Sequence, residues 1–249
     1  MKATAVLGAV FKQREKRPVE VVSSGLSEVD SLSGGLPRGS IIEVFGPASS
    51  GRTSFMLSTL TQATDHDEIC ALVDTSGSFD PVSAAANGLA LERLLWVRCS
   101  ANLEHAFKAT DLILQGGGFG LVALDLGDVP AKEVRRIISS WWYRFRRVLE
   151  NTPTILIVLA QDSTVRSCAA LSLELRRESG LWGSATRGQE TKPSGPIPLR
   201  NSTRLELSRP SPGLPSSAVL LKGMQFQVAK RRPLNSHEQE CRFSSATMP

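Results

Sequence analysis

The sequence has no apolar run that reaches the roughly 18 residues of a membrane-spanning helix. Its four cysteines lie far apart and form no CxxC pair, which argues against a zinc site and against a disulfide scaffold. Cys70 and Cys99 lie in apolar stretches, as small buried hydrophobes in a reducing compartment do. The apolar segment 3–11 is short and leads into the charged residues 12–17 instead of a small-residue cleavage site, so we expect an N-terminal helix and no signal peptide. These absences favour a cytoplasmic protein without membrane contact.

Positive charge is in modest excess. The formal net charge of +5 favours polyanionic partners such as nucleic acid without establishing one. Part of this charge lies in a predicted helix over residues 131–150, where Pro130 suits the helix start and residues 151–153 end it. Its apolar residues follow the 3.6-residue period, and its lysines and arginines lie mostly elsewhere on the cylinder. This basic surface could contact DNA or an acidic partner, but we favour the solvent-facing side of a helix that covers a sheet.

Apolar runs alternate with helical patterns along most of the chain. The five runs are residues 41–45, 70–74, 94–97, 121–125 and 154–159. Such continuous runs suit strands that are covered on both faces, as in a parallel sheet. Because helical patterns separate them, they predict βαβ units. The fold class is therefore α/β, with a mostly parallel central sheet flanked by helices.

The composition changes in the last quarter of the chain to glycine, proline, serine and threonine. We divide the chain into an N-terminal helix and lead-in (1–33), a core (34–182), a flexible loop (183–217), terminal strands of the core (218–232) and a disordered tail (233–249). Two similar segments, 171–176 and 205–209, could each supply the penultimate strand of the sheet. We favour the first, because it follows the fifth apolar run at an ordinary spacing.

A glycine-rich segment follows the first apolar run and opens a helix. It consists of Gly46, Pro47, Ala48, Ser49, Ser50, Gly51, Arg52 and Thr53. The pattern GxxxxG[K/R]T between a strand and a helix indicates a phosphate-binding loop (P-loop) strongly, because the context agrees with the motif. The glycines let backbone N–H groups surround a phosphate, and the helix N-terminus favours negative charge there. We therefore predict an ATP site.

Magnesium is expected at the same place. Thr53 offers a hydroxyl to Mg²⁺, and Asp125, at the end of an apolar strand, can hold the same ion through water. Arg52 stands where a lysine is usual; it keeps the charge but is longer and planar. We expect ATP binding to survive in weakened form and turnover to suffer more. The alternative is a relic loop that binds nothing.

These residues resemble the RecA recombinase family. Residues 42–53 match its IVEIxGPxSSGKT segment almost residue for residue, and residues 73–81 resemble its IDAEHALDP segment. Residues 121–125 match its Walker B strand. The resemblance covers residues 1–180 and resumes near 218–235, and it implies a RecA-like P-loop fold with a flexible C-terminal region.

The resemblance also implies further nucleotide contacts. Gln161 lies where family members carry Asn-Gln at a strand end. Residues 226–232 resemble the late strand whose cations reach a neighbouring protomer's ATP, so Lys230 and Arg232 are candidate trans-acting residues. Self-association is thereby implied.

Departures from the family are equally informative. Ser76 stands where the catalytic glutamate belongs, and losing such a base typically costs about 10²–10⁴ in rate. Neither Asp74 nor Asp80 is placed by the pattern to replace it. The DNA-binding loop expected soon after Asp125 is absent, and no segment matches the large C-terminal domain of recombinases. Hydrolysis is therefore doubtful, and a complete strand-exchange enzyme is not expected.

A shortened, degenerate RecA-like chain resembles the ImuA group, accessory proteins of inducible translesion synthesis. That resemblance implies a role in the DNA damage response with polymerase-type or RecA-like protein partners. One alternative is an active, filament-forming ATPase stimulated by single-stranded DNA. Another is a protein-interaction scaffold for which nucleotide is irrelevant.

A second DNA-binding loop depends on which segment is the penultimate strand. If residues 205–209 form it, the region after Gln161 could hold a long loop with Trp182, Arg187, Lys192 and Arg200 for stacking and phosphate contacts. If residues 171–176 form it, the same residues belong to an inserted surface loop.

Overall fold

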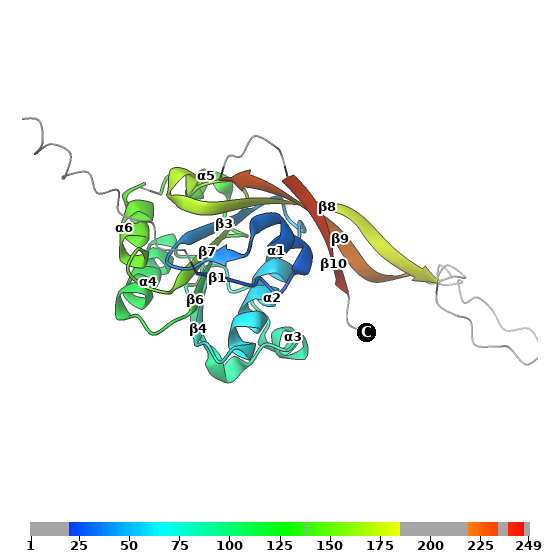
Figure 1. Cartoon of the computed structure of the whole chain (residues 1–249), viewed down its shortest axis with the longest axis horizontal. Coiled ribbons are helices and arrows are strands. Elements are labelled where there is room, and N and C mark those ends of the chain that lie inside the picture. The colour runs from blue at the N-terminus through cyan, green and yellow to red at the C-terminus, as the bar shows by residue number, and fades with distance from the viewer. Residues whose placement is uncertain (1–19, 138, 185–218, 234–238, 247–249) are drawn as a thin grey trace, which may run out of the picture.

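The computed structural model describes residues 20–137, 139–184, 219–233 and 239–246. They form an α/β fold around a sheet of eight strands in the order β10-β9-β8-β3-β7-β6-β4-β5, with helices on both faces (Figure 1). The strands are β3 (Ile41–Phe45), β4 (Cys70–Asp74), β5 (Leu94–Arg98), β6 (Leu121–Asp125), β7 (Ile155–Ala160), β8 (Ala169–Ser184), β9 (Val219–Arg232) and β10 (Gln239–Ala246). A separate antiparallel pair joins β1 (Val21–Val22) to β2 (Leu36–Pro37). The predicted fold class is confirmed.

The strands from β8 to β5 are parallel, and β9 and β10 complete the sheet in the antiparallel sense. Every residue of β4 and β7 is buried, because helices cover both faces of the sheet at its centre. The helices are α1 (Ser27–Ser33), α2 (Arg52–Asp65), α3 (Pro81–Ala86), α4 (Leu103–Gly116), α5 (Ala131–Val134) and α6 (Ser140–Leu149), with short 3₁₀ turns at Leu91–Arg93 and Arg166–Cys168.

Two apolar cores hold the layers together. Helices α1, α2 and α3 pack on one face of the sheet, with Phe55, Met56 and Leu60 of α2 at the centre of that core. Helices α4, α5 and α6 pack on the other face. There the ring of Phe107 in α4 stacks on Phe145 in α6 at a centroid separation of 5.8 Å.

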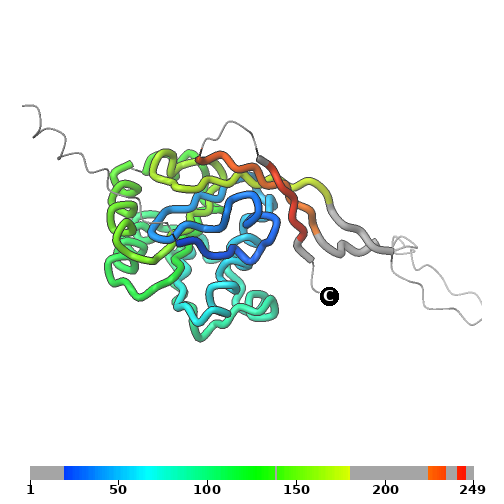
Figure 2. Tube along the Cα trace, in the orientation of Figure 1, coloured from blue at the N-terminus to red at the C-terminus, as the bar shows by residue number. Residues whose placement is uncertain are grey.

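Strands β8 and β9 extend beyond the rest of the sheet. They stay paired out to Ser184 and Val219, whereas the pairing of β10 with β9 ends at Gly223. Their distal parts therefore form a projecting two-stranded ribbon (Figure 1), and the yellow and orange segments of the tube in Figure 2 mark where β8 and β9 leave the core. Residues 171–176 lie in β8, so the strand that precedes β9 is the one we favoured from the sequence. Residues 205–209 lie outside the described part of the chain, as do the predicted N-terminal helix and nearly all of the flexible loop.

The expectation of a disordered tail from residue 233 is wrong for residues 239–246. These residues form β10, whose Phe243 is buried and packs on Phe226 of β9 at 5.1 Å between ring centroids. The alternation that marks a strand is weak here, because only Cys241 and Phe243 supply the apolar face.

The single helix predicted over residues 131–150 is also wrong. After α5 the backbone tightens into i→i+3 hydrogen bonds from Arg136 N–H to Glu133 and from Ile137 N–H to Val134, and α6 begins at Ser140. Within α6 the buried residues are Trp142, Phe145 and Leu149, and Trp142 is 4% exposed. Arginines of this region pair with acidic neighbours, Arg135 with Asp162 among them, as the solvent-facing interpretation requires.

Strand β5 is not buried on both faces as its apolar run suggested. It is the last strand of the sheet on its side, and Leu95 is 44% exposed. Trp96 instead packs edge-on against Phe79 and donates its indole N–H to Asp74. A position at the sheet edge, which a single sequence does not reveal, explains the difference.

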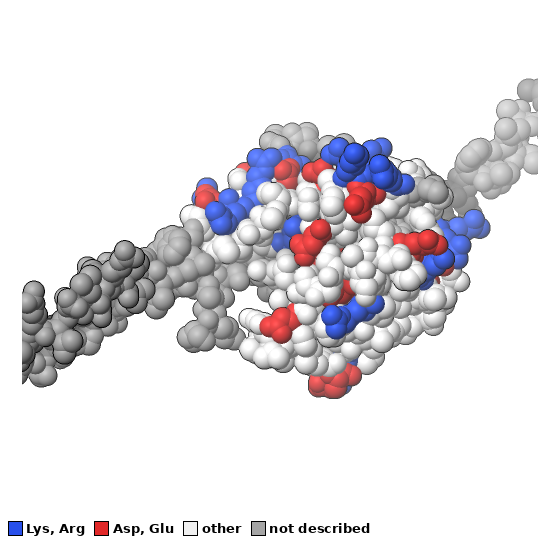
Figure 3. Space-filling model, turned by 180° about the vertical axis from the view of Figure 1, so that it is seen from behind, with Lys and Arg blue, Asp and Glu red and all other residues white. Residues whose placement is uncertain are grey.

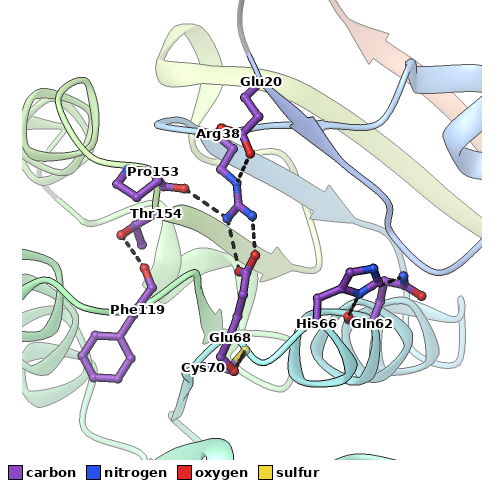
Figure 4. Close-up of polar contacts among 9 residues, drawn as sticks. All are labelled: Glu20, Arg38, Gln62, His66, Glu68, Cys70, Phe119, Pro153 and Thr154. Atoms are coloured by element: carbon purple, nitrogen blue, oxygen red, sulfur yellow. Dashed lines mark hydrogen bonds and ion pairs between the residues drawn. The ribbon is translucent and has the colours of Figure 1, made fainter.

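Arg38 ties together three connections at the end of the sheet that lies opposite the P-loop (Figure 4). Its guanidinium donates to both carboxylate oxygens of Glu68, and its Nη1 also donates to the carbonyl of Pro153 at 3.3 Å. Glu20 lies 3.5 Å from its Nε. The hydrogen bond to Glu68 raises the pKa of Arg38, although burial opposes the change. The Arg38 clamp, formed by Arg38 with Glu68 and Pro153, therefore joins the β2–β3 turn to the α2–β4 and α6–β7 connections.

Replacing Arg38 with alanine is expected to lower the free energy of unfolding by about 2 kcal/mol, because Glu68 would keep a half-buried charge without its partner. Urea denaturation of the full chain measures this loss. Arg93→Ala is the matched control: Arg93 also pairs with an acidic residue, but the Asp67 side chain is 85% exposed, so the loss is about 0.5 kcal/mol. Equal losses in the two variants would contradict the clamp.

Candidate functional site

The predicted P-loop connects β3 to α2 at the carboxyl end of the parallel strands. Gly46 passes so close to β8 that a Cβ atom there would lie 2.1 Å from the carbonyl oxygen of Leu175. Ser49 adopts the left-handed region with φ of 59°. The loop is thus held on one side by the backbone of the neighbouring strand.

Gly51, the second glycine of the motif, is restricted by β9. Its φ is +94°, and a Cβ atom there would lie 2.8 Å from the ring of Phe226. Both the backbone conformation and the close aromatic ring therefore require glycine. The loop conformation depends on β8 and β9, which lie more than 100 residues further along the chain.

The donors of this loop suit a phosphate. Helix α2 begins at Arg52 with no side-chain cap on its N-terminus and no acidic residue in its first turn. Ser50 is 1% exposed, and its hydroxyl has no hydrogen-bond partner among the described residues. Thr53 is exposed at the start of the helix. Backbone N–H groups at a helix N-terminus together with two hydroxyls form a suitable site for an anion.

Asp125 ends β6 beside Asp74 of β4. Its Oδ1 accepts the backbone N–H of Gly127 at 2.8 Å. Burial raises the pKa of Asp125 to about 6; the Gly127 hydrogen bond opposes this, and the charges of Asp128 and Asp74 add to it. A cation bound here would favour the ionised carboxylate.

The peptide units of Gly127 connect three of the predicted site residues. Its N–H is the donor to Asp125, and its carbonyl oxygen accepts from Arg52 Nη1 at 3.1 Å and from Gln161 Nε2 at 3.2 Å. A Cβ atom on Gly127 would lie 2.9 Å from Asp125 Oδ1 and 3.0 Å from Arg52 Nη1. The P-loop, the end of β6 and the end of β7 therefore meet at one glycine.

Arg52 lies inward from the loop. It is 8% exposed, and burial lowers its pKa, although the charges of Asp125 and Asp128 oppose this. Its guanidinium spans the gap between the first turn of α2 and the connection after β6. No hydrogen bond joins Thr53 to Asp125 among the described residues, so a shared magnesium ion remains a prediction for these two.

The loop after β4 carries no free carboxylate. Ser76 is exposed, and Asp74 is 1% exposed with its oxygens bonded to the N–H groups of Gly77, Ser78 and Phe79. Asp80 caps α3 by accepting from Val82 and Ser83. Both aspartates therefore bond to backbone N–H groups of this loop and of α3, a role that the sequence analysis did not assign to them.

Lys230 and Arg232 lie away from the P-loop of their own chain. Leu175, which touches Gly46, pairs with Val228, whereas Lys230 pairs with Leu173 and Arg232 with Ser172. At about 3.3 Å per residue, the two cations are roughly 7 and 13 Å along β9 from the level of Gly46. This placement leaves them available to another molecule, and their trans role stays a prediction.

A groove of about 550 Å³ adjoins the first turn of α2. Ser54 and Leu57 of α2, Ser83 of α3 and Phe243 of β10 are among its lining residues. Hydroxyl and amide side chains form most of its lining, with Leu57 and Phe243 among the apolar contacts, and its volume is within the usual range of small-molecule sites.

Comparison with known protein families identifies the chain. The RecA N-terminal domain model matches residues 4–138. The chain belongs to the RecA N-terminal domain family. The match includes the P-loop, Ser76 and Asp125, and membership makes this a RecA-like nucleotide-binding protein. Gln161, Lys230 and Arg232 lie beyond the matched residues, so their assignment depends on the structure and on the resemblance.

The site fits a magnesium ion that a nucleotide brings with it. No cluster of three or more histidine, cysteine, aspartate or glutamate side chains that could hold a metal occurs among the described residues. Magnesium in nucleotide sites takes one or two protein ligands and completes its shell with phosphate oxygens and water. Thr53 and Asp125 are of the right chemistry for that role. Separately, none of the described helices has the length and apolar character needed to cross a membrane.

Sequence reasoning missed three residues that shape the site. Gly127 follows Asp125 closely, which was an available signal, but its role depends on side chains from two other elements. Phe226 was recognised only as a strand residue. Glu43, buried in β3, anchors the connection after Gln161 and was read only as part of an apolar run.

Gly51→Ala is expected to lower the free energy of unfolding by about 2–3 kcal/mol and to weaken nucleotide binding, because it combines left-handed strain with a clash against Phe226. Gly118→Ala is the control: its φ of +82° carries the strain, but no atom lies within 4 Å of the added Cβ. Urea denaturation separates the two contributions. If Gly51→Ala loses no more than Gly118→Ala, the packing against Phe226 does not shape the loop.

Asp125→Asn is expected to stabilise the metal-free chain above pH 6. The native carboxyl keeps its proton in the folded state up to about pH 6 and loses it near its ordinary value of 3.8 when unfolded. The protonated carboxyl of Asp125 therefore stabilises the folded state fully below pH 4. This stabilisation falls as the pH rises and is lost above pH 6, so the free energy of unfolding is lower by on the order of 2 kcal/mol at pH 8.

Urea denaturation with EDTA at pH 5 and pH 8 tests this dependence. The gap between Asp125→Asn and the native chain should widen toward pH 8. Asp80→Asn serves as the control. Hydrogen bonds from Ser83 lower the pKa of Asp80, so the stabilising effect of its carboxylate is present at both pH 5 and pH 8. A constant gap for Asp125→Asn between the two pH values would refute the prediction.

Proposed function

We propose that this chain binds ATP with Mg²⁺ through residues 46–53 and hydrolyses it slowly or not at all. The observation that carries this proposal is the combination of an intact loop geometry with a β4–α3 loop that lacks a free carboxylate. The close approach of β8 leaves no room for a Cβ atom at Gly46, and Gly51 combines a left-handed φ with a close contact to Phe226. Asp74 and Asp80, the acidic residues nearest to Ser76 in sequence, are both committed to backbone N–H groups.

Each proposed ligand has a distinct task. Backbone N–H groups of the loop and the Ser50 hydroxyl surround the phosphates. Thr53 and Asp125 hold the metal, which supplies charge neutralisation to the phosphate oxygens. Gln161 donates to the Gly127 carbonyl, so a shift of Gly127 on nucleotide binding would move Gln161 and the β7–β8 connection that follows it. The groove beside Ser54 offers space for the base and sugar.

Arg52 supports binding over turnover. Its buried guanidinium already donates to the Gly127 carbonyl, so a phosphate must either share Arg52 with that carbonyl or displace it. In either case Arg52 is a weaker donor to the phosphate oxygens, on which negative charge develops in the transition state of hydrolysis. Catalysis depends on donors that are already fixed toward those oxygens. ATP would then act here mainly as a ligand.

For the biological role we propose an ImuA-like accessory factor in DNA repair and the damage response. The connections after β6 and β7 are both short: α5 begins at Ala131, and a 3₁₀ turn begins at Arg166. Neither provides the extended DNA-binding loop of a recombinase. On this reading residues 34–182 are the nucleotide-binding core, β9 and β10 complete its sheet, and a polymerase-type or RecA-like protein is the principal partner.

Direct DNA binding has weaker support. On the face shown in Figure 3, lysine and arginine side chains form separate patches with acidic groups between them, and no continuous basic surface covers it. We therefore propose single-stranded DNA only as a secondary partner. A filament-forming ATPase is the second candidate, and the placement of Lys230 and Arg232 away from their own P-loop favours it.

Labelled ATP, with and without single-stranded DNA, separates these candidates when binding and phosphate release are both followed. We expect saturable binding with little release in either condition. The double variant Arg52→Lys/Ser76→Glu should raise phosphate release on the order of 10²-fold, because it restores a compact cation and a general base.

The matched control is Arg52→Lys/Ser78→Glu, which adds a carboxylate to the same loop at the wrong position. DNA-stimulated release by the native chain at the rate of the first double variant would refute the proposal and favour the filament-forming enzyme. No measurable ATP binding would identify the loop as a relic.

A further inference from the structure

The carbonyl oxygen of Gly127 accepts from two side chains that reach it from different elements. Arg52 Nη1 donates to it at 3.1 Å, and Gln161 Nε2 donates to it at 3.2 Å. A carbonyl oxygen has two lone pairs, so these two donors satisfy it completely. Gly127 is buried, and the loss of one donor still leaves its oxygen hydrogen-bonded to the other.

The two donors respond differently to a bound phosphate. Arg52 opens α2 within the P-loop and carries a positive charge, so an anion in the loop attracts its guanidinium. The amide of Gln161 is neutral and feels no comparable attraction. Arg52 is therefore the donor that a phosphate draws from the carbonyl, and Gln161 is the donor that remains.

The remaining donor affects the free energy of binding. A buried acceptor that loses its last hydrogen bond carries the full cost of its desolvation. If Arg52 were the sole donor, its movement toward a phosphate would leave the Gly127 carbonyl unpaired, and this cost would oppose binding. The hydrogen bond from Gln161 removes that cost.

The position of Gln161 depends on the turn that follows it. Glu43 of β3 has 0% exposure, and its carboxylate accepts from the Ser163 hydroxyl at 2.9 Å and from the N–H groups of Thr164 and Val165. These donors begin two residues after Gln161. Because a buried charge is stable only with its hydrogen bonds in place, Glu43 holds this turn in one conformation.

Strand β3 connects the P-loop to the same turn. It carries Glu43 and ends at Phe45, directly before Gly46, and Glu43 pairs with Val158 of β7 in the parallel sheet. The β3–β7 pairing therefore fixes the distance between the P-loop and the turn after Gln161. Arg52 can move toward a phosphate while the turn stays in place.

We propose that Gln161 keeps the Gly127 carbonyl hydrogen-bonded when a phosphate draws Arg52 away from it, and that Glu43 is the positioning residue that keeps Gln161 within reach of this carbonyl. The inference rests on the proposed nucleotide function and adds determinants of affinity that lie outside the P-loop. Neither Gln161 nor Glu43 touches the nucleotide in this exchange. The effect is therefore the same for every nucleotide whose phosphates engage Arg52.

Calorimetric titration of the full chain with ATP and with ADP, each with Mg²⁺, tests the role of Gln161. Gln161→Met keeps the length of the side chain without its N–H groups and should weaken the binding of both nucleotides about tenfold. The urea denaturation of the nucleotide-free chain should change little, because Arg52 still donates to the carbonyl there. A loss for ATP alone would indicate a direct contact with the third phosphate and would contradict the exchange.

Gln115→Met is the matched control for this change. The Gln115 amide also donates a side-chain hydrogen bond, to Asp111 within α4, and plays no part in the nucleotide site. Its nucleotide affinities should equal those of the native chain.

Glu43→Gln should weaken the binding of both nucleotides several-fold. Ser172→Ala is the control, because the Ser172 hydroxyl donates to the same carboxylate from β8 and not from the turn; its affinities should stay within about twofold of the native values. The double variant Glu43→Gln/Gln161→Met should bind as Gln161→Met alone does, because Glu43 acts through Gln161. Additive losses would show that Glu43 supports the site by another route.

Two results separate this inference from the proposed function. If the native chain binds ATP and Gln161→Met binds both nucleotides equally well, the exchange is overturned and the proposed function stands. If the native chain binds neither nucleotide, both fail together. Circular dichroism checks folding, and if Glu43→Gln does not fold, the comparison of Gln161→Met with the native chain still decides.

Discussion

The peptide units on either side of Gly127 carry the contacts on which the site depends. They accept from Arg52 and Gln161 and donate to Asp125. Each of these side chains comes from a different parallel strand or from the helix after one, so the sheet must form before they can meet. Because a Cβ atom at Gly127 would touch both Asp125 and Arg52, glycine is the residue that allows this approach.

Arg52 gives these contacts their particular character. A lysine at this position would present a single ammonium on a flexible stem, whereas the guanidinium is planar and has several donors in fixed directions. One edge of Arg52 can therefore stay on the Gly127 carbonyl while other donors turn to a phosphate. Under the proposed function, Arg52 would link occupancy of the loop to the ends of β6 and β7, without the compact charge that a lysine would bring to the phosphates.

Much of this could be predicted from local sequence. Continuous apolar runs gave β3, β4, β6 and β7, and the glycine motif gave the loop, because both are local patterns. The exposure of β5, the break before α6 and the existence of β10 could not be obtained in this way. Each depends on what packs beside it: a sheet edge for Leu95, the aromatic cluster around Trp142 and the Phe226 ring for Phe243. Gly127 and Phe226 escaped notice for the same reason, since their roles come from distant partners.

The anchoring of the 161–168 connection bears on what nucleotide binding can achieve. Gln161 follows β7 and donates to the Gly127 carbonyl, and residues 163–165 are fixed by the buried Glu43. A change at the P-loop that reaches Gln161 therefore meets a short, hydrogen-bonded turn, whereas a recombinase has a long loop there. Under the proposed function, such a change would alter a small surface near α5 and would not reorganise a DNA-binding groove. Such a limited response suits a protein that presents a surface to one partner in a nucleotide-dependent way.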